Sequence, residues 1–152
     1  MGRDIEVQDT LSSFRDATWE LDSIYAMFPK SCGLAEAEYW SLLLIYDGVV
    51  TQSKISERLF ISKQTLNSAF KQLRKKGLVR LEPYAENQRS KQAFLTEAGK
   101  IFVEYHILRM HHIEENAWRR LSSEERGSLI GLTKKVCRLM RDELEGSQSN
   151  TI

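Results

Sequence analysis

Two short helices around a tight turn, between residues 51 and 76, constrain the fold of this chain more than any other feature. Thr51 and Ser62 are positioned to cap the two helices, because their hydroxyls can accept hydrogen bonds from the free N–H groups of a first turn. Phe60 and Ile61 form the predicted turn, and Gly77 ends the second helix. Residues at helical spacing predict the buried stripes of both helices: Ile55, Leu59, Leu66, Phe70 and Leu73.

A β-hairpin is predicted directly after this helix pair. Residues 78–81 (LVRL) and 92–95 (QAFL) have the composition of short strands, and residues 83–91 between them are predicted to form a polar loop. The chain is predicted to return to helix after Thr96. The expected fold class is mainly α with a small β-hairpin wing: a winged helix-turn-helix flanked by N- and C-terminal dimerisation helices.

The flanking helices are predicted from apolar residues at three- and four-residue steps. The first three cover residues 14–28, closed by Pro29, then 35–46 and 97–121. A last helix starts at a capping box formed by Ser122 and Glu125 and is followed by a frayed tail, GSQSNTI. The buried side of the second helix is predicted to hold Ala37, Trp40, Ser41, Leu44 and Ile45. The predicted buried positions of the helix at 97–121 are Phe102, Tyr105, Ile113, Ala117 and Leu121. The last helix carries the apolar residues Leu129, Leu132, Val136, Leu139 and Met140.

The terminal helices are more apolar than a small helix-and-hairpin lobe needs for its own core. Phe14, Tyr25, Phe28, Ile113, Trp118, Leu129, Val136 and Met140 are the residues concerned. We therefore expect a single domain, 1–152, with a winged helix-turn-helix lobe at about 35–98 and dimerisation helices at about 8–29 and 98–145. The alternative is that these side chains form an ordinary core within one chain.

Positive charge is concentrated in the predicted helix pair and hairpin. Residues 51–100 contain eleven Lys and Arg against four Glu, a net charge of +7 in a chain whose total is +1. Residues 1–50 carry −6, and residues 101–152 are neutral. Such segregation indicates a polyanionic partner, and a capped helix pair with a basic hairpin points to double-stranded DNA.

The second helix of the pair offers side chains suited to a major groove. Gln64 and Asn67 have amide groups that can pair bidentately with adenine. Arg89, in the polar loop, could enter a neighbouring minor groove, where the negative potential favours Arg. Phosphate or weaker base contacts are expected from Thr51, Ser53, Ser62, Lys63, Thr65, Ser68, Lys71, Arg74 and Lys91.

These segments resemble the MarR (multiple antibiotic resistance regulator) family of winged-helix transcription factors. The resemblance rests on residues 51–63 (TQSKISERLFISK), 73–79 (LRKKGLV) and 95–99 (LTEAG), and its pattern extends over the whole chain. It implies an obligate homodimer with interlocked first and last helices, a recognition helix from Ser62 to Lys76, and Arg89 at the wing tip. The wing reads Asn-Gln-Arg where the family often has Asp-Arg-Arg, and Phe60 replaces a small turn residue, which predicts a packed turn.

Three kinds of sensor site are considered for such a regulator. Trp19, Tyr25, Phe28, Tyr39 and Trp40 could line a pocket for a small apolar or aromatic effector, although plain core packing explains them as well. Cys32, near a predicted helix start, could have a lowered pKa and sense oxidation. His111 and Glu115 are weak candidates for a metal site because their i, i+4 spacing lets both reach one ion.

Other functional classes receive little support. We find no nucleophile motif, no glycine-rich phosphate loop and no carboxylate pair set in an apolar pocket, so an enzyme is not expected, and no cofactor is expected. No membrane-spanning run or secretory signal is seen, and a cytoplasmic protein is expected. The remaining alternatives are a winged-helix module that binds protein without specific DNA binding, and a regulator that senses a metal or oxidation.

Overall fold

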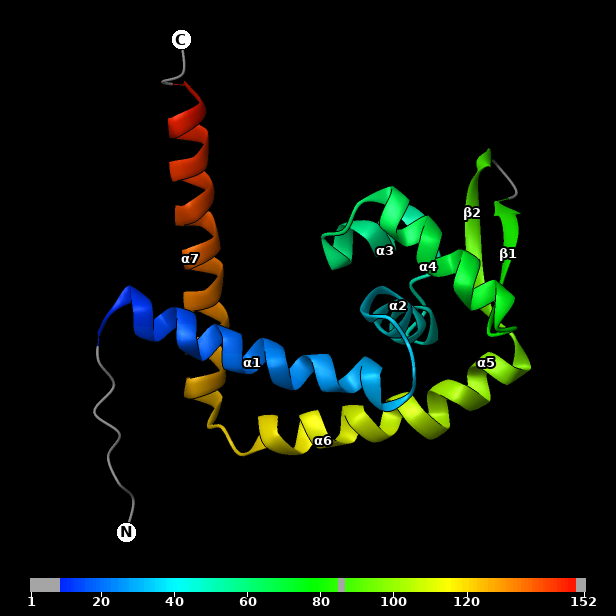
Figure 1. Ribbon diagram of the computed structural model, residues 1–152, viewed down its shortest axis with the longest axis horizontal. Coiled ribbons are helices and arrows are strands. Elements are labelled where there is room, and N and C mark those ends of the chain that lie inside the picture. The colour runs from blue at the N-terminus through cyan, green and yellow to red at the C-terminus, as the bar shows by residue number, and fades with distance from the viewer. Residues whose placement is uncertain (1–8, 85–86, 150–152) are drawn as a thin grey trace. The chain divides into compact units, whose positions relative to one another are not determined.

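The computed structural model describes the backbone of residues 9–84 and 87–149 and the side chains of residues 9–83 and 91–149. The chain divides into two compact units, residues 1–110 and 111–152. The described elements confirm a mainly helical fold with one two-stranded antiparallel hairpin (Figure 1). None of the described helices combines the length and apolar character needed to cross a membrane.

Helix α1 (Leu11–Ser31) begins at Thr10, whose hydroxyl accepts a hydrogen bond from the Ser13 N–H at 3.1 Å. The prediction that Pro29 closes this helix was wrong by one half-turn, because Pro29 lies buried inside the last turn and Ser31 ends it. Proline loses its own N–H and crowds the carbonyl four residues before it, but neither effect prevents the residues after it from completing the last turn. Gly33, at φ +70°, then turns the chain toward α2.

Helix α2 (Glu36–Tyr46) lies at the centre of the first unit and is seen nearly end-on in Figure 1. Tyr39, Leu42 and Ile45 are buried on it and belong to the core cluster. Ser41 is buried as predicted, whereas Ala37, Trp40 and Leu44 are only half-buried. A helix surrounded on most sides has no clean polar face, so periodicity alone cannot locate its buried residues.

Helices α3 (Gln52–Leu59) and α4 (Lys63–Lys75) form the predicted helix-turn-helix pair. The predicted cap at Ser62 is present, since its hydroxyl accepts a hydrogen bond from the Thr65 N–H at 3.0 Å. The predicted cap at Thr51 is wrong: Thr51 stands at the N-cap position, but its hydroxyl is buried and makes no hydrogen bond. The predicted apolar stripe of α4 is buried, with Leu66, Phe70 and Leu73 each at most 1% exposed.

The turn between α3 and α4 differs from the expectation of a packed turn. Phe60 adopts left-handed backbone angles, φ 53° and ψ 41°, and its side chain is 83% exposed. The Phe60 and Ile61 N–H groups donate to carbonyls of α3, at 3.3 and 3.1 Å, which closes the helix in the manner usual for a glycine. The backbone therefore takes the ordinary shape of the turn, and the ring is directed outward.

The wing is a longer hairpin than predicted. Strand β1 (Val79–Tyr84) pairs antiparallel with β2 (Asn87–Leu95), with Val79 opposite Leu95. The predicted loop over residues 83–91 was wrong, because much of that segment is strand. A two-stranded ribbon is held by backbone hydrogen bonds and can expose polar side chains on both faces, so polarity did not reveal it. The Ala93 N–H also donates to Val50 O at 2.7 Å, which joins the wing to the start of α3.

A long helix leaves the wing as α5 (Glu97–Phe102), the π-helical segment η1 (Val103–Ile107) and α6 (Leu108–Arg119). The Thr96 hydroxyl caps α5 by accepting from the Gly99 N–H at 3.0 Å and also donates to Gly77 O. Val103 and Ile107 are fully buried, whereas Tyr105, predicted to be buried, is 75% exposed. The π turn changes which side chains face the core, and a continuous α-helical period cannot anticipate that change.

The second unit contains the end of α6 and the last helix, α7 (Ser123–Ser149). The predicted capping box is present: the Glu125 N–H donates to the Ser122 hydroxyl, and the Glu125 carboxylate accepts from the Ser122 N–H. Helix α7 continues to Ser149, so the predicted frayed tail was wrong for residues 146–149, and residues 150–152 lie outside the description. Ile113 and Ala117, which were predicted to be buried, are exposed in the chain, and so are Leu129, Leu132, Leu139 and Met140 of α7.

Candidate nucleic-acid interface

The exposed face of α4 is polar and basic along its whole length. Leu66, Ala69, Phe70 and Leu73 fix the buried side against the core. At helical spacing, this anchoring leaves the predicted contact residues on the solvent side: Lys63, Gln64, Thr65, Asn67, Ser68, Lys71 and Arg74, all exposed. The structure thus brings both proposed base-reading amides and the proposed phosphate contacts onto one element.

The N-terminus of α4 is well ordered by its cap. The Ser62 hydroxyl lies 2.9 Å from the Thr65 hydroxyl in addition to its bond with the Thr65 N–H. The predicted roles of these two side chains therefore compete with a structural one. The remaining free N–H groups and the helix dipole still make this end of the helix favourable for a phosphate.

Two DNA contacts were predicted at the start of α3, Thr51 and Ser53, and only one of them is accessible. Ser53 is exposed in the first turn. Thr51 is only partly exposed, and its hydroxyl oxygen lies in the interior without a hydrogen-bond partner. The Thr51 hydroxyl cannot reach a phosphate without a change in its side-chain position.

An ion pair missed by the sequence analysis holds the far end of α4. The Lys76 Nζ donates to Glu38 Oε2 at 2.7 Å, and the Glu38 side chain is only 7% exposed. Glu38 lies on α2 and Lys76 is the C-cap of α4, so the pair fixes α4 to the central helix α2. A carboxylate within an apolar helix was the available signal, but its partner 38 residues away could not be identified from spacing.

The wing presents cations close to the hairpin strands. The Arg80 guanidinium lies 5.4 Å from the centre of the Phe94 ring, and its Nε is 3.1 Å from Glu82 Oε1. Lys91 is exposed on β2. The backbone of Arg89 belongs to β2, but its side chain lies outside the described residues, so the predicted minor-groove contact stays a prediction. Arg80 was absent from the predicted contacts and is now a further candidate.

The aromatic residues predicted to line an effector pocket do not form one group. Tyr25, Phe28, Tyr39 and Trp40 contact one another with ring centres 4.9–6.3 Å apart, and Phe28 and Tyr39 are buried. Trp19 is 63% exposed on α1. Ring-to-ring packing explains the four as core, while the half-buried Tyr25 and Trp40 are the members that a ligand could reach.

The other two sensor candidates gain no support from geometry. Burial raises the pKa of the Cys32 thiol, and hydrogen bonding around Ser31 opposes this only in part, so the suggested lowering was wrong. His111 Nε2 and His112 Nδ1 each lie 3.9 Å from a Glu115 oxygen, and Arg119 approaches the same carboxylate at 3.4 Å. Within the described ranges, no three His, Cys, Asp or Glu side chains are arranged to hold a metal ion.

A helix pair whose second helix is capped by Ser62, a hairpin packed beside that helix and a polar, basic exposed surface define a winged helix-turn-helix protein. The model for the MarR family matches residues 33–90. A Bacillus subtilis (strain 168) protein described as the uncharacterized HTH-type transcriptional regulator YybA is 31% identical over 119 residues, which are 76% of this chain and 78% of that protein. The chain belongs to the MarR family of transcriptional regulators, as its sequence motifs predicted.

Solved structures share this fold at lower sequence identity. A Staphylococcus aureus MepR–DNA complex has a TM-score of 0.67 and 22% identity, over 86% of this chain and 98% of that one. Bordetella bronchiseptica BpsR, whose DNA binding is described as regulated by 6-hydroxynicotinic acid, has a TM-score of 0.67 and 18% identity, over 90% and 98% of the two chains.

Proposed function

We propose that this protein is a cytoplasmic, sequence-specific DNA-binding regulator that acts as a homodimer on a pseudo-palindromic operator. The observation that carries the proposal is the exposed face of α4, where Gln64 and Asn67 stand among cations and opposite a fully buried stripe. In this assignment the two amides read base edges, and the hydroxyls and cations around them hold phosphates. The structural similarity to MepR, solved with DNA, supports the same use of the fold.

The phosphate contacts are proposed from exposed side chains only. Lys63, Lys71 and Arg74 on α4 and Lys91 on β2 supply charge, and Ser53, Ser62, Thr65 and Ser68 supply hydroxyls. Arg89 remains the proposed minor-groove probe. The Thr51 hydroxyl is left out because it is buried. A dimer would place two recognition helices about 34 Å apart, one turn of DNA.

The homodimer is proposed from apolar side chains that the described residues leave uncovered. In α1 these are Leu11, Phe14, Leu21, Ile24 and Met27, and in α7 they are Leu129, Leu132, Leu139, Met140 and Leu144. Uncovered apolar surface of this extent, on two long helices, is typical of a subunit interface. In this proposal, the winged lobe covers about residues 35–98, and the dimerisation helices precede and follow it in the sequence, at about 8–29 and 98–145.

We further propose that a small apolar or aromatic molecule modulates DNA binding. The half-buried Tyr25 and Trp40, at the edge of the aromatic cluster, are the candidate entry point. BpsR, which is regulated by a small aromatic acid, supports modulation of this kind in the fold. The test is DNA affinity measured in the presence of candidate molecules, with and without Trp40→Ala.

The DNA-binding assignment is tested by selecting bound duplexes from a random pool and then measuring affinities of variants by fluorescence anisotropy. Gln64→Ala and Asn67→Ala should each reduce discrimination between operator and random DNA by about 1–3 kcal/mol. Gln72→Ala is the matched control, an exposed amide on the same helix that is not assigned to a base. Equal weakening on operator and random DNA would show that Gln64 and Asn67 hold phosphates instead. If the affinity for DNA did not fall with rising salt concentration, phosphate contacts would be absent, and the alternative of a winged-helix module that binds protein would be favoured.

A further inference from the structure

One turn of the long helix that leaves the wing is wider than an α-helical turn. Between α5 and α6, the Leu108 N–H donates to Val103 O, five residues back, so this π turn holds one residue more than an α-helical turn. Single π turns are rare, and they occur frequently at functional sites. This one ends at Ile107, just before the first compact unit ends at Met110. It therefore lies where the lobe that carries α4 is joined to the rest of the chain.

The buried side chains explain why the helix accommodates the extra residue. Gly99, Val103 and Ile107 are buried, at steps of four. In an α-helix, two steps of four would turn the third position about 80° away from the first. The wider turn reduces this drift, so Val103 and Ile107 are both fully buried where η1 packs against α2. The Tyr46 hydroxyl, at the end of α2, also donates to Glu104 Oε1 at 3.5 Å.

An α-helical closure of the same segment would exchange a buried isoleucine for a histidine. With one residue fewer in the turn, each later residue would take the place of the residue after it, so His106 would enter the position that Ile107 now occupies. Burying an imidazole in an apolar site is unfavourable. In the π form His106 is exposed instead, against the rings of Phe102 and Tyr105 at 4.7 and 5.1 Å between centres. A small set of side-chain contacts thus opposes the general preference of the backbone for an α-helical turn.

We propose that the π turn is a register switch between the winged lobe and the second unit. In its α-helical form, every residue after the turn is rotated by about 100° and moved by about 1.5 Å along the helix axis relative to the lobe. Residues 111–152 follow the turn and form a compact unit, so they would rotate together. The consequence for DNA rests on the proposed function: two recognition helices of a dimer fit successive turns of DNA in the π form only.

The first experiment deletes single exposed residues from the full-length protein and measures thermal unfolding by circular dichroism. Deletion of Tyr105, which is 75% exposed, should leave Tm within about 4 °C of the wild type, because the shortened turn closes as an α-helix with Val103 and Ile107 still buried. Deletion of Lys100, an exposed residue of α5, is the matched control. It should lower Tm by about 10 °C or more, because Glu104 then takes the buried place of Val103. Equal losses in the two variants would overturn the proposal.

The second experiment uses His106→Leu to favour the α-helical form, since leucine suits the buried place that this form offers. Operator affinity, measured by fluorescence anisotropy, should fall about tenfold or more while Tm stays constant or rises. Deletion of Tyr105 in the same chain should restore the affinity, because the shortened turn has the π register and no other. His112→Leu, the same change at an exposed histidine of α6, should bind the operator as the wild type does.

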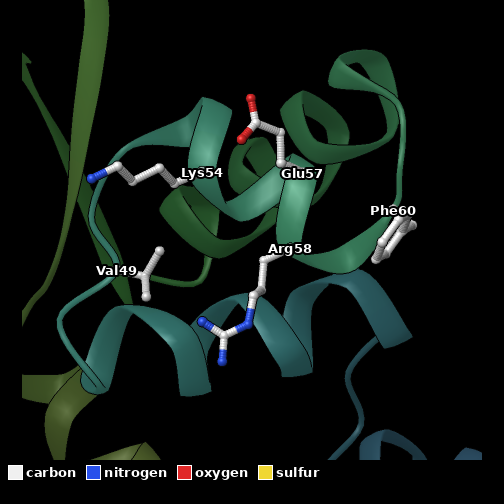
Figure 2. A pocket seen from close by; sticks show the side chains of 5 residues that line it. All are labelled: Val49, Lys54, Glu57, Arg58 and Phe60. Carbon is white, nitrogen blue, oxygen red and sulfur yellow. The ribbon is translucent and has the colours of Figure 1, made fainter. Parts of the chain in front are cut away.

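The register is also read without DNA, from the distance between spin labels in the two units. One label is placed at Cys137 on α7 and the other at Glu57→Cys on α3, in a Cys32→Ser background, with labelled chains diluted into unlabelled ones. Glu57 is exposed where it lines a surface hollow, and Figure 2 shows its side chain on the opposite side of α3 from Arg58. His106→Leu should displace the distance distribution, and the added deletion of Tyr105 should restore it.

The two readouts separate the switch from the proposed function. An unchanged label distance in His106→Leu would overturn the switch, as would a loss of operator affinity that the deletion of Tyr105 fails to restore, because His106 would then act on DNA directly. A displaced distance with unchanged operator affinity would overturn the control of DNA binding. If the distances follow the expected pattern but no duplex is selected from the random pool, the DNA-binding proposal fails and the register switch stands.

Discussion

Gly99 occupies a position that no side chain can share. A Cβ there would stand 2.8 Å from the Leu78 carbonyl carbon and closer still to its oxygen, and backbone atoms cannot move aside as a side chain can. This close approach seats α5 against the base of the wing, where Thr96 also bonds to Gly77. At the residue scale, the contact between the wing and α5 requires a glycine at position 99, because the Cβ of any other residue would clash with the Leu78 backbone.

We predict that Gly99→Ala lowers the free energy of unfolding by about 1–3 kcal/mol, the usual range for overpacking. Urea denaturation followed by circular dichroism measures it. Gly127→Ala is the control, because Gly127 lies in α7 with no neighbour within 4 Å of an added Cβ. That variant should gain about 0.5–1 kcal/mol from helix propensity. A neutral Gly99→Ala would mean that the contact with Leu78 relaxes freely.

At Phe60, unlike at Gly99, a substitution is predicted to maintain or increase stability. A left-handed conformation costs an ordinary residue roughly 1–2 kcal/mol, and asparagine adopts it more readily. Since the Phe60 ring is mostly exposed, Phe60→Asn should keep the free energy of unfolding or raise it by up to about 1 kcal/mol. Thermal and urea unfolding decide the sign. A loss above about 1 kcal/mol would indicate that the ring packs in the folded protein.

At the element scale, the orientation of α4 depends on a pair that crosses the lobe. Lys76→Met leaves the buried Glu38 carboxylate without its cation, and the partial exposure of Lys76 moderates the cost, so a loss of about 1–3 kcal/mol is expected. Lys75→Met, at an exposed neighbouring position, should change stability little. In the double variant with Glu38→Gln, most of the loss should return. An additive double variant would show that the two residues are not coupled.

The elements divide into those that local rules predict and those that they do not. Caps at Ser62 and Ser122 and the stripe of Leu66, Phe70 and Leu73 involve residues a few positions apart, and the sequence was sufficient for them. The extension of the wing strands beyond the predicted segments, the π turn at Val103–Ile107 and the Glu38–Lys76 pair depend on backbone pairing or contacts between distant segments. Neither hydrophobic period nor charge pattern encodes such contacts, which explains why they were missed.

For the whole molecule, the same distinction applies to the proposed interface with DNA. The amphipathic period of α4 was enough to place Gln64, Asn67 and Lys71 on an exposed face. The sequence could not reveal that the Thr51 hydroxyl is buried, because its environment is set by the wing, which pairs with it through Gln92. The terminal helices were correctly expected to be amphipathic, but many of their apolar side chains, among them Leu21 and Leu132, stay exposed within the described residues of each unit.

The homodimer therefore provides the decisive test at this scale. Leu21 on α1 and Leu132 on α7 are 53% and 61% exposed in the chain, so Leu21→Glu and Leu132→Glu should cost a monomer little. In a dimer each would bury a carboxylate, at a cost of several kcal/mol. Both variants should shift the protein from dimer to monomer in sedimentation velocity and weaken operator binding. Lys134→Glu introduces a carboxylate at an exposed position of the same helix and should remain dimeric. A wild-type protein that stays monomeric while bound to its operator would reject the two-fold model, because one recognition helix would then suffice for binding.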